Sequence, residues 1–280
     1  MEQYIDLHVH SNCSDGTMPP EEVVQYAAKK KLSAIALTDH DTIKGIPAAK
    51  SEAEKLGLEL IPGIEFSTNY HGKDIHILGL DIDVENAYFT GSLTQFLDSR
   101  DARNQKMIDL LAEHGINISW NIMKQRFPGS VWTRAHFARY LLDEGYVASI
   151  PEAFSRYIGD TACCFVPREK VTPFQAIRLI HEGNGIAALA HPLLYHLSEP
   201  ELNDLTGALK KAGLEAIEAV YSANRWMDEG NMRLLAKKFG LKITGGSDFH
   251  GGNKPDIDLG SGRGNLKIPY QIWENLKKGR

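Results

Sequence analysis

Two pairs of metal-binding residue types, each with one residue between its members, stand at opposite ends of the chain. His8 and His10 lie near the start, and Asp248 and His250 lie near the end. In an extended strand, alternate side chains fall on one face, so both members of each pair leave the backbone side by side. One such pair is an ordinary strand end. Two pairs, with further residues of the same kind, indicate a metal site.

Those further residues lie within, at the end of, or just beyond an expected strand. They are Asp15, His40, Glu65, His76 and His191. Taken singly, a histidine at a strand end is usually a polar residue whose hydrogen bonds the protein satisfies. In parallel α/β barrels, however, the carboxyl ends of the strands form the active-site face. We therefore expect all nine side chains to converge in one pocket.

Imidazole and carboxylate ligands without thiolate suit Mn²⁺, Fe²⁺ or Zn²⁺. Nine ligands exceed the about four to six that one ion takes, so we expect two or three divalent ions, with Glu65 bridging a pair. Bridged ions lower the pKa of a shared water and neutralise the oxygens of a phosphoryl group under attack. The sequence contains neither a GxSxG motif nor a Walker-type glycine loop. A protein nucleophile is not required.

The elements that position these residues alternate between strand and helix along the chain. Buried-strand patterns cover residues 4–10, 33–37, 58–64, 74–80, 185–190, 214–220 and 242–246. Helical patterns cover residues 20–30, 45–56, 172–182, 202–212 and 229–239, with a closing helix near 269–280. This alternation predicts an α/β protein with a parallel sheet, open or closed into a barrel.

The alternation stops between residues 89 and 158, where only helical periodicity is found. Helices are expected at 93–115, 120–126, 133–144 and 151–157. We therefore predict two regions: a metal-binding barrel formed by residues 1–88 and 159–280, and a helical subdomain of residues 89–158 inserted into it.

The bulk composition is that of an ordinary globular enzyme, with 42% hydrophobic and 24% charged residues among 280. No apolar run reaches membrane-spanning length, and the start resembles no signal peptide. Three cysteines without CxxC spacing favour a reducing cytoplasm. The net charge of −5 gives no basic footprint for extended duplex binding, so we expect a small or short phosphorylated substrate.

A series of motifs in this sequence resembles that of the PHP (polymerase and histidinol phosphatase) family, almost from end to end. The motifs are Asp-Leu-His-Val-His-Ser-Asn-Cys-Ser-Asp-Gly from Asp6, Thr-Asp-His-Asp from Thr38, Gly-Ile-Glu from Gly63, His-Ile-Leu-Gly from His76, Leu-Ala-His-Pro from Leu189 and Gly-Ser-Asp-Phe-His from Gly246. The resemblance implies a distorted (β/α)₇ TIM-like barrel related to the amidohydrolases, with a di- or trinuclear metal centre that hydrolyses phosphoesters.

The resemblance also implies how the ligands divide among the ions. One ion takes His8, His10, Glu65 and Asp248, a second takes Glu65, His76 and His191, and a third takes Asp15, His40 and His250. All nine positions are filled in this sequence.

The helical insertion resembles one branch of the family: stand-alone bacterial enzymes that act on 3′,5′-bisphosphonucleotides and on the 5′ ends of short RNAs. The supporting stretch is Trp132-Thr-Arg-Ala-His136, although the branch often has proline where Ala135 stands. Arg134 and His136 could form a fork that orients a phosphate. The alternative is a surface arginine and a histidine that caps a helix.

Other polar residues are expected to support the site. Arg168 and Arg263 are weaker candidates for binding a second phosphate. Asp39 and Asp41 flank His40, and we interpret them as carboxylates that orient imidazole rings. Asp39 is in addition a candidate proton donor.

The favoured function is a metal-dependent phosphoesterase acting on nucleotides, with Arg134 stabilising the phosphoryl oxygens and metal-activated hydroxide attacking phosphorus. Histidinol-phosphate phosphatase is the alternative within this class. Hydrolysis of a C–N or C–O bond, as in amidohydrolases, is an alternative in which the same hydroxide attacks carbon. A regulatory module that keeps its metals for structure is the third.

Overall fold

The computed structural model describes residues 2–167 and 171–279, in which seven strands form one sheet in the order of the sequence, β1 to β7. The strands are β1 (Ile5–Val9), β2 (Ala34–Leu37), β3 (Glu59–Tyr70), β4 (Lys73–Leu80), β5 (Ile186–Leu189), β6 (Ala216–Tyr221) and β7 (Lys242–Gly246). Each is short and rich in buried aliphatic residues, as expected of strands covered on both faces.

The first and last strands meet and bring the sheet close to a closed barrel. The Asp248 amide donates to the His8 carbonyl at 2.9 Å, and the His10 amide donates to the Phe249 carbonyl at 3.0 Å. A parallel bridge joins Val9 to Phe249. The two polar pairs that the sequence places at opposite ends of the chain are therefore neighbours. The barrel, with helices outside it and added helices to one side, confirms the expected fold class.

The expectation of an all-parallel sheet is wrong for β4, which runs antiparallel to both β3 and β5. The turn between β3 and β4 consists of His71 and Gly72, both at positive φ (51° and 82°), as in a type I′ hairpin turn. A two-residue connection can join only antiparallel strands. β3 also continues to Tyr70, beyond the expected end at residue 64, and pairs Ser67 with His76.

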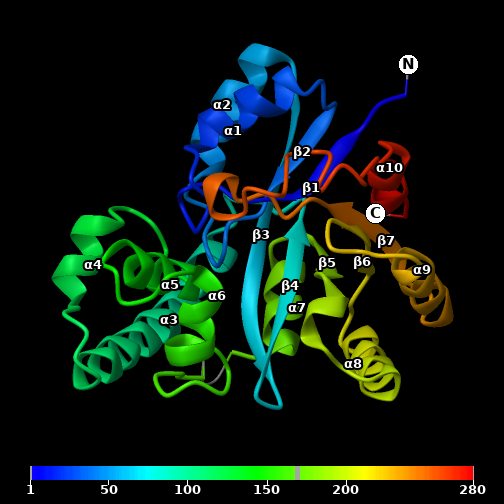
Figure 1. Cartoon of the computed structure of the whole chain (residues 1–280). Helices are drawn as coiled ribbons and strands as arrows, with labels where there is room; N and C mark the ends of the chain where they lie inside the picture. Colours follow the sequence, from blue (N-terminus) through cyan, green and yellow to red (C-terminus); the bar gives the residue numbers. More distant parts are fainter. Residues whose placement is uncertain (1, 168–170, 280) are drawn as a thin grey trace.

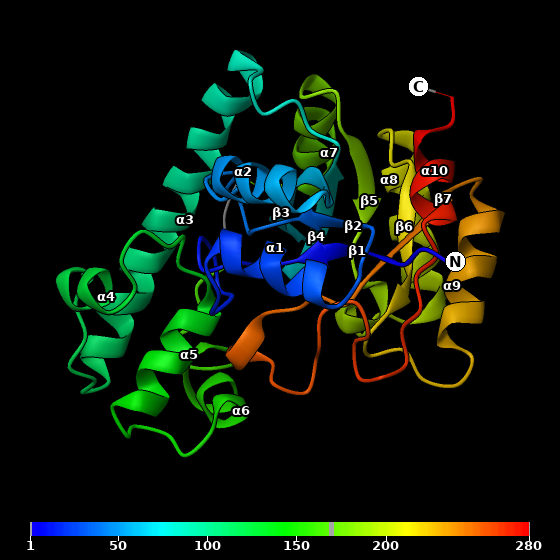
Figure 2. The ribbon, with the colours of Figure 1, turned by 90° about the horizontal axis from the view of Figure 1, so that it is seen from above.

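Helices cover the outside of the barrel (Figures 1 and 2). They are α1 (Pro20–Lys29), α2 (Ile46–Leu56), α7 (Pro173–Glu182), α8 (Glu199–Lys211), α9 (Asp228–Lys238) and α10 (Gln271–Lys277), with short 3₁₀ turns η2 (Pro192–Tyr195) and η3 (Gly251–Asn253). Local signals set their ends: Thr172 and Gln175 form a capping box at the start of α7, and Gly57 ends α2 with φ 66°.

The remaining helices pack beside the barrel on the side opposite α8–α10, as Figures 1 and 2 show in green. They are α3 (Ala87–Glu113), α4 (Trp120–Arg126), α5 (Arg134–Asp143), α6 (Ile150–Ala153) and the π-helical turn η1 (Phe154–Ile158). They share an apolar cluster of their own that includes Met107, Leu111, Phe137 and Ile158.

The long helix α3 belongs to both regions. Its first turns place Phe89 and Phe96 against Phe66 of the barrel, whereas its later turns place Met107 and Leu111 in the cluster of the added helices. The division into a barrel and an insertion of residues 89–158 stays a prediction. Within the described ranges, no helix is both long and apolar enough to cross a membrane.

Candidate metal centre and its cavity

Glu65 lies among five histidines, two of them within β1 and β4 and three in the residues that follow β1, β2 and β5. Its Oε2 atom lies 3.2 Å from His8 Nε2, from His10 Nε2 and from His40 Nδ1. Its Oε1 atom lies 2.8 Å from His76 Nδ1 and 2.9 Å from His191 Nε2. Glu65 is 1% exposed. Both of its oxygens therefore face imidazole nitrogens in a space closed to bulk solvent.

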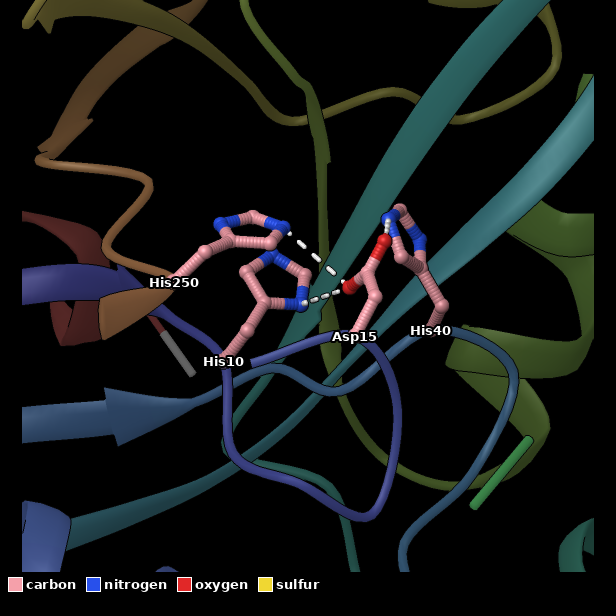
Figure 3. A group of neighbouring side chains, drawn as sticks. All are labelled: His10, Asp15, His40 and His250. Carbon is pink, nitrogen blue, oxygen red and sulfur yellow. Dashed lines mark ion pairs between the residues drawn. The ribbon is translucent and has the colours of Figure 1, made fainter. Parts of the chain in front are cut away.

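Asp15 gathers a second set of imidazoles, shown in Figure 3. Its Oδ1 atom lies 3.2 Å from His250 Nε2 and 3.8 Å from His10 Nδ1, and its Oδ2 atom lies 3.7 Å from His40 Nε2. His10 and His40 thus face both Asp15 and Glu65, so the two sets are contiguous.

Asp248 closes the cluster from the end of β7. Its Oδ1 atom lies 3.3 Å from His250 Nδ1, 3.5 Å from His10 Nε2 and 3.7 Å from His8 Nε2. Asp248 and His191 have φ values of 59° and 25°, which non-glycine residues rarely adopt. Strain of this kind persists where the surrounding structure fixes a functional side chain.

The nine residues predicted as metal ligands therefore lie together, and their chemistry fits divalent ions. In the described part of the chain, His8 Nε2, His10 Nε2, Asp15 Oδ1 and Glu65 Oε2 are buried without a hydrogen-bond partner. Buried polar atoms are rarely left so, except where a metal takes them. Groups able to hold one ion include His8–His10–Asp248, His8–Glu65–His191, His40–Glu65–His76 and His10–Asp15–His40–His250. Several residues belong to more than one group.

Glu218 is a functional residue that sequence reasoning missed. It lies fully buried in β6, accepts from the His191 amide at 2.8 Å and contacts His8 Nδ1 at 3.0 Å. A carboxylate on one ring nitrogen turns the other nitrogen toward a metal and raises its basicity. The signal was present, since Glu218 is the one charged residue in the apolar strand Ala-Ile-Glu-Ala-Val-Tyr.

The cluster shifts the protonation of its members in opposite directions. Burial opposes charge on His8, but Glu218, Glu65 and Asp248 outweigh it and raise the pKa of His8 well above its ordinary value. Burial, with repulsion from His250, lowers the pKa of His10 to about 3. Burial also opposes ionisation of Glu65, yet the surrounding histidines hold its pKa well below the usual range. An ionised Glu65 beside a neutral His10 is a state that can bind a cation.

A cavity of about 220 Å³ lies directly against this cluster. Its lining joins Asp15, His40 and His76 of the cluster to four cations, namely Arg100, Arg103, Arg134 and Lys254. Phe154 adds an aromatic face. The lining of the cavity therefore combines cations with carboxylates and imidazoles.

Arg134 is held by acids and aromatic rings. Its Nη1 donates to Asp160 at 2.6 Å and its Nη2 donates to Asp74 at 2.5 Å. Its guanidinium carbon lies 5.9 Å from the Phe154 ring centre and 5.4 Å from that of Phe165. Arg134 therefore lies at the cavity, as expected, with a fixed orientation.

Arg100 and Arg103, three residues apart on α3, were not predicted. Arg100 is 2% exposed and donates through Nε to Asp41 at 2.8 Å, with Nη2 also paired to Asp41. Its Nη2 donates to Ser67 Oγ at 2.8 Å, and Ser67 Oγ lies 3.3 Å from His40 Nδ1. Asp41 therefore supports His40 through Arg100 and Ser67. The repeat of arginines at helical spacing was the available signal.

His136 caps α5. Its Nδ1 accepts from the Thr133 amide at 3.0 Å in a capping box, and burial lowers its pKa to about 4. Thr133 Oγ1 donates to Asp15 Oδ2 at 2.8 Å. The structure thus connects His136 to the cluster through Thr133, and direct contact of His136 with substrate stays a prediction.

Asp39 supports the loop that carries Asp15. It accepts from the Ser11 amide and Oγ at 2.8 and 2.6 Å and from Ser14 Oγ at 2.6 Å, and Ser14 Oγ in turn lies 3.4 Å from His10 Nδ1. Its part as a proton donor stays a prediction.

Of the two other arginines predicted to bind a phosphate, only Arg263 lies among the described residues. Arg263 is exposed in the loop after β7, where its amide donates to Asn265 Oδ1 at 3.1 Å. It does not belong to the described residues that line the cavity. Arg168 lies outside the described residues.

The chain matches one protein family and is similar to several known proteins along most of its length. The chain matches the PHP domain over residues 6–170. It is 38% identical over 278 residues to a 5′-3′ exoribonuclease of Haemophilus influenzae, covering 99% of this chain and 100% of that one. It is 30% identical over 274 residues to a 3′,5′-nucleoside bisphosphate phosphatase of Chromobacterium violaceum, covering 98% and 96%. A solved amidohydrolase structure from Chromobacterium violaceum with bound sulfate has a TM-score of 0.88 at 29% identity, covering 98% and 96%.

Proposed function

The chain belongs to the PHP domain family of metal-dependent phosphoesterases, and from that premise we propose that it hydrolyses phosphate esters of nucleotides. The substrates we propose are 3′,5′-bisphosphonucleotides and the 5′ ends of short RNAs. The observation that carries the proposal is the cavity in which Arg100, Arg103, Arg134 and Lys254 face the carboxylate–imidazole cluster.

We propose that the nine residues hold two or three divalent ions, of Mn²⁺, Fe²⁺ or Zn²⁺, with Glu65 bridging. The contacts of Glu65 with five imidazoles support this role. When bound, such ions lower the pKa of a coordinated water and neutralise charge on phosphoryl oxygens. Glu218 fixes the orientation of His8, and Asp39 fixes the loop that presents Asp15.

The cations of the cavity bind the phosphate groups. Arg134 presents a planar fork suited to two phosphate oxygens, and its Asp74 and Asp160 partners hold that fork in place until phosphate displaces one of them. Lys254 Nζ lies 2.7 Å from Asp248 Oδ2. This contact raises the pKa of Lys254 despite its burial, so the lysine stays charged beside the cluster. Lys254 is the charge nearest to a phosphoryl group at the cluster.

A substrate with two phosphoryl groups on one ribose matches this layout, because one group can lie at the cluster while the other lies among the arginines. The names of the relatives describe such substrates: a nucleoside 3′,5′-bisphosphate and an RNA cut from its 5′ end. Phe154 offers a face on which a base can stack. Four cations in the cavity lining suit an anionic phosphoryl substrate better than an uncharged amide, which argues against C–N hydrolysis.

One assay series tests the proposal. Manganese-loaded protein is mixed separately with adenosine 3′,5′-bisphosphate, a short 5′-phosphorylated RNA, histidinol phosphate and a panel of amides. We expect phosphate release from the bisphosphate and stepwise shortening of the RNA from its 5′ end. Turnover of histidinol phosphate or of amides, without turnover of the bisphosphate or the RNA, would refute the nucleotide assignment. Protein that binds metal but turns over no phosphoester would instead favour a regulatory module.

Phe154→Ala sharpens the assignment to nucleotides. Loss of a stacking face should raise the KM for the bisphosphate about tenfold, since stacking contributes about 1–3 kcal/mol per base. The KM for a substrate without a base, such as ribose 5-phosphate, should not change. An equal rise for both substrates would show that Phe154 acts by holding Arg134.

A cytoplasmic location remains a proposal from the cysteine content.

A further inference from the structure

A second group of metal-binding atoms lies at the C-terminal end of α3, among residues that the phosphoesterase proposal does not use. His114 follows the last turn of α3, and Cys163 and Cys164 follow η1. The two sulfur atoms lie 3.6 Å apart, and Cys164 Sγ lies 3.6 Å from His114 Nδ1. One ligand atom from each of the three residues falls within 4.8 Å of the other two.

We propose that His114, Cys163 and Cys164 bind one zinc ion at a site separate from the barrel cluster. With Zn–S near 2.3 Å and Zn–N near 2.0–2.1 Å, a tetrahedral ion sets its sulfurs about 3.8 Å apart and a sulfur and a nitrogen about 3.6 Å apart. The sulfur–sulfur separation of 3.6 Å is close to the first value. Two thiolates and one imidazole select a softer ion than the carboxylate–imidazole cluster does.

The backbone holds the three residues in place without a metal. The Cys164 amide donates to the Tyr157 carbonyl at 2.8 Å, and Cys164 is fully buried in the apolar cluster of the added helices. His114 Nδ1 lies 2.8 Å from the Leu110 carbonyl, and a ring that donates there keeps the lone pair of Nε2 for a metal. Cys163 and His114 are exposed, so an ion and a completing water can enter from solvent.

Burial, with the neighbouring Cys163, raises the pKa of Cys164 to about 12, so this thiol is protonated until an ion binds. Binding of Zn²⁺ to a thiol releases its proton to solvent as the Zn–S bond forms, so the affinity rises with pH. No oxidant or reductant is involved.

The site has a structural consequence that rests on the proposed function. The segment with the two cysteines also carries Asp160 and Phe165, which hold Arg134 by an ion pair and by ring contact. An ion that joins this segment to α3 would fix the support of the arginine. The barrel cluster would then line the cavity, and the zinc site would fix the position of Arg134 in that lining.

Cobalt absorption tests the site independently of catalysis. Reduced full-length protein, first loaded with Mn²⁺, is titrated with Co²⁺. We expect a thiolate-to-cobalt charge-transfer band that saturates at one ion per chain, because the barrel cluster contains no thiolate among its described members. Zn²⁺ should abolish the band and slow alkylation of Cys163 at least about tenfold.

Exposed residues provide variants that keep the fold. Cys163→Ser and His114→Gln should lose the band or weaken Co²⁺ binding at least about tenfold. Cys13→Ser should keep the band, and so should Asp248→Asn, which alters the barrel cluster. Absence of the band in the unaltered protein, its survival in Cys163→Ser, or its loss in Cys13→Ser would overturn the zinc site. Turnover of nucleotides without the band would overturn this site and leave the proposed function standing.

Discussion

The barrel and the added helices face the same cavity with different chemistry. The barrel contributes carboxylates and imidazoles from the ends of its strands, in a cluster whose members are nearly all buried. The added helices contribute cations, with Arg100 and Arg103 from α3 and Arg134 from α5. One region is arranged to hold positive ions, and the other is arranged to hold negative ones.

The difference indicates a division of labour. Backbone hydrogen bonds between β1 and the residues after β7 fix the cluster. The arginines instead depend on side-chain partners, such as Asp74 and Asp160 for Arg134. Changes in the barrel should therefore affect turnover and metal binding, whereas changes in the helices should affect substrate affinity. Single substitutions in the two regions test this contrast.

The largest effect is expected for Asp248→Ala. The substitution removes an oxygen that lies near three imidazoles and leaves Lys254 beside the cluster without its partner. We expect kcat to fall more than about 100-fold, since loss of a residue that merely supports a ligand already costs up to about 100-fold. Steady-state kinetics and metal analysis measure this, with Asp109→Ala on the exposed face of α3 as the control. Full activity in Asp248→Ala would show that the metal site is wrong.

Arg100→Ala should be the most destabilising change in the helices. It leaves Asp41, a buried carboxylate, without the guanidinium that neutralises it, since both side chains are nearly inaccessible. Breaking such a pair costs about 3–5 kcal/mol. Urea unfolding measures the loss, with the exposed Arg139→Ala as the matched control. The double variant Arg100→Met with Asp41→Asn should recover most of the stability. No recovery would mean that packing of Arg100, rather than its charge, is what stabilises the fold.

Glu218→Gln tests whether Glu218 supports the metal cluster through its contact with His8. The amide cannot match the carboxylate on His8 Nδ1, so we expect metal affinity to fall about 10- to 100-fold. Titration of the apo-protein with Mn²⁺ measures the shift, and excess Mn²⁺ should restore kcat. If kcat stayed low at saturating metal while affinity was normal, Glu218 would act on substrate and not on His8.

Arg134→Ala should raise KM with little change in kcat. Loss of a charged hydrogen-bond donor costs about 1.5–3 kcal/mol, so KM should rise about 10-fold or more. Arg139→Ala, on the same helix, is again the control. An equal fall in kcat at normal KM would place Arg134 in the chemical step and would remove the contrast between the two regions.

His136→Gln should have the smallest effect. Glutamine can accept from the Thr133 amide as histidine does, so the cap is kept and stability should change by less than about 1 kcal/mol. KM should stay within about twofold. A tenfold rise in KM with an unchanged melting temperature would show that His136 contacts the substrate directly, as its spacing from Arg134 predicted.

The barrel was largely predictable from sequence. The alternation of strands and helices and the nine clustered residues follow from short local patterns, because alternate residues of a strand share a face. The end of β3 was expected at residue 64 instead of Tyr70, and the direction of β4 was missed because every strand was expected to follow a helix. The lack of a helical pattern between residues 65 and 73 was the available signal.

The lining of the cavity was harder to predict. Arg134 was found through a motif, but Arg100, Arg103 and Lys254 were not. Their roles depend on how α3 and the loop after His250 fold back onto the barrel, which is a long-range property. Glu218 was missed although it is the lone acid in an otherwise apolar strand.

The Asp41–Arg100 pair limits how this protein can be truncated or combined with segments of a relative. A barrel expressed without α3 would retain Asp41 in its interior with no guanidinium to neutralise it, at a cost comparable to half the stability of a small domain. A chimaera that carries the helices of a relative would function only if it had an arginine at the position of Arg100 on α3. The helices and the barrel are thus expected to function only as a matched pair, although each has an apolar cluster of its own.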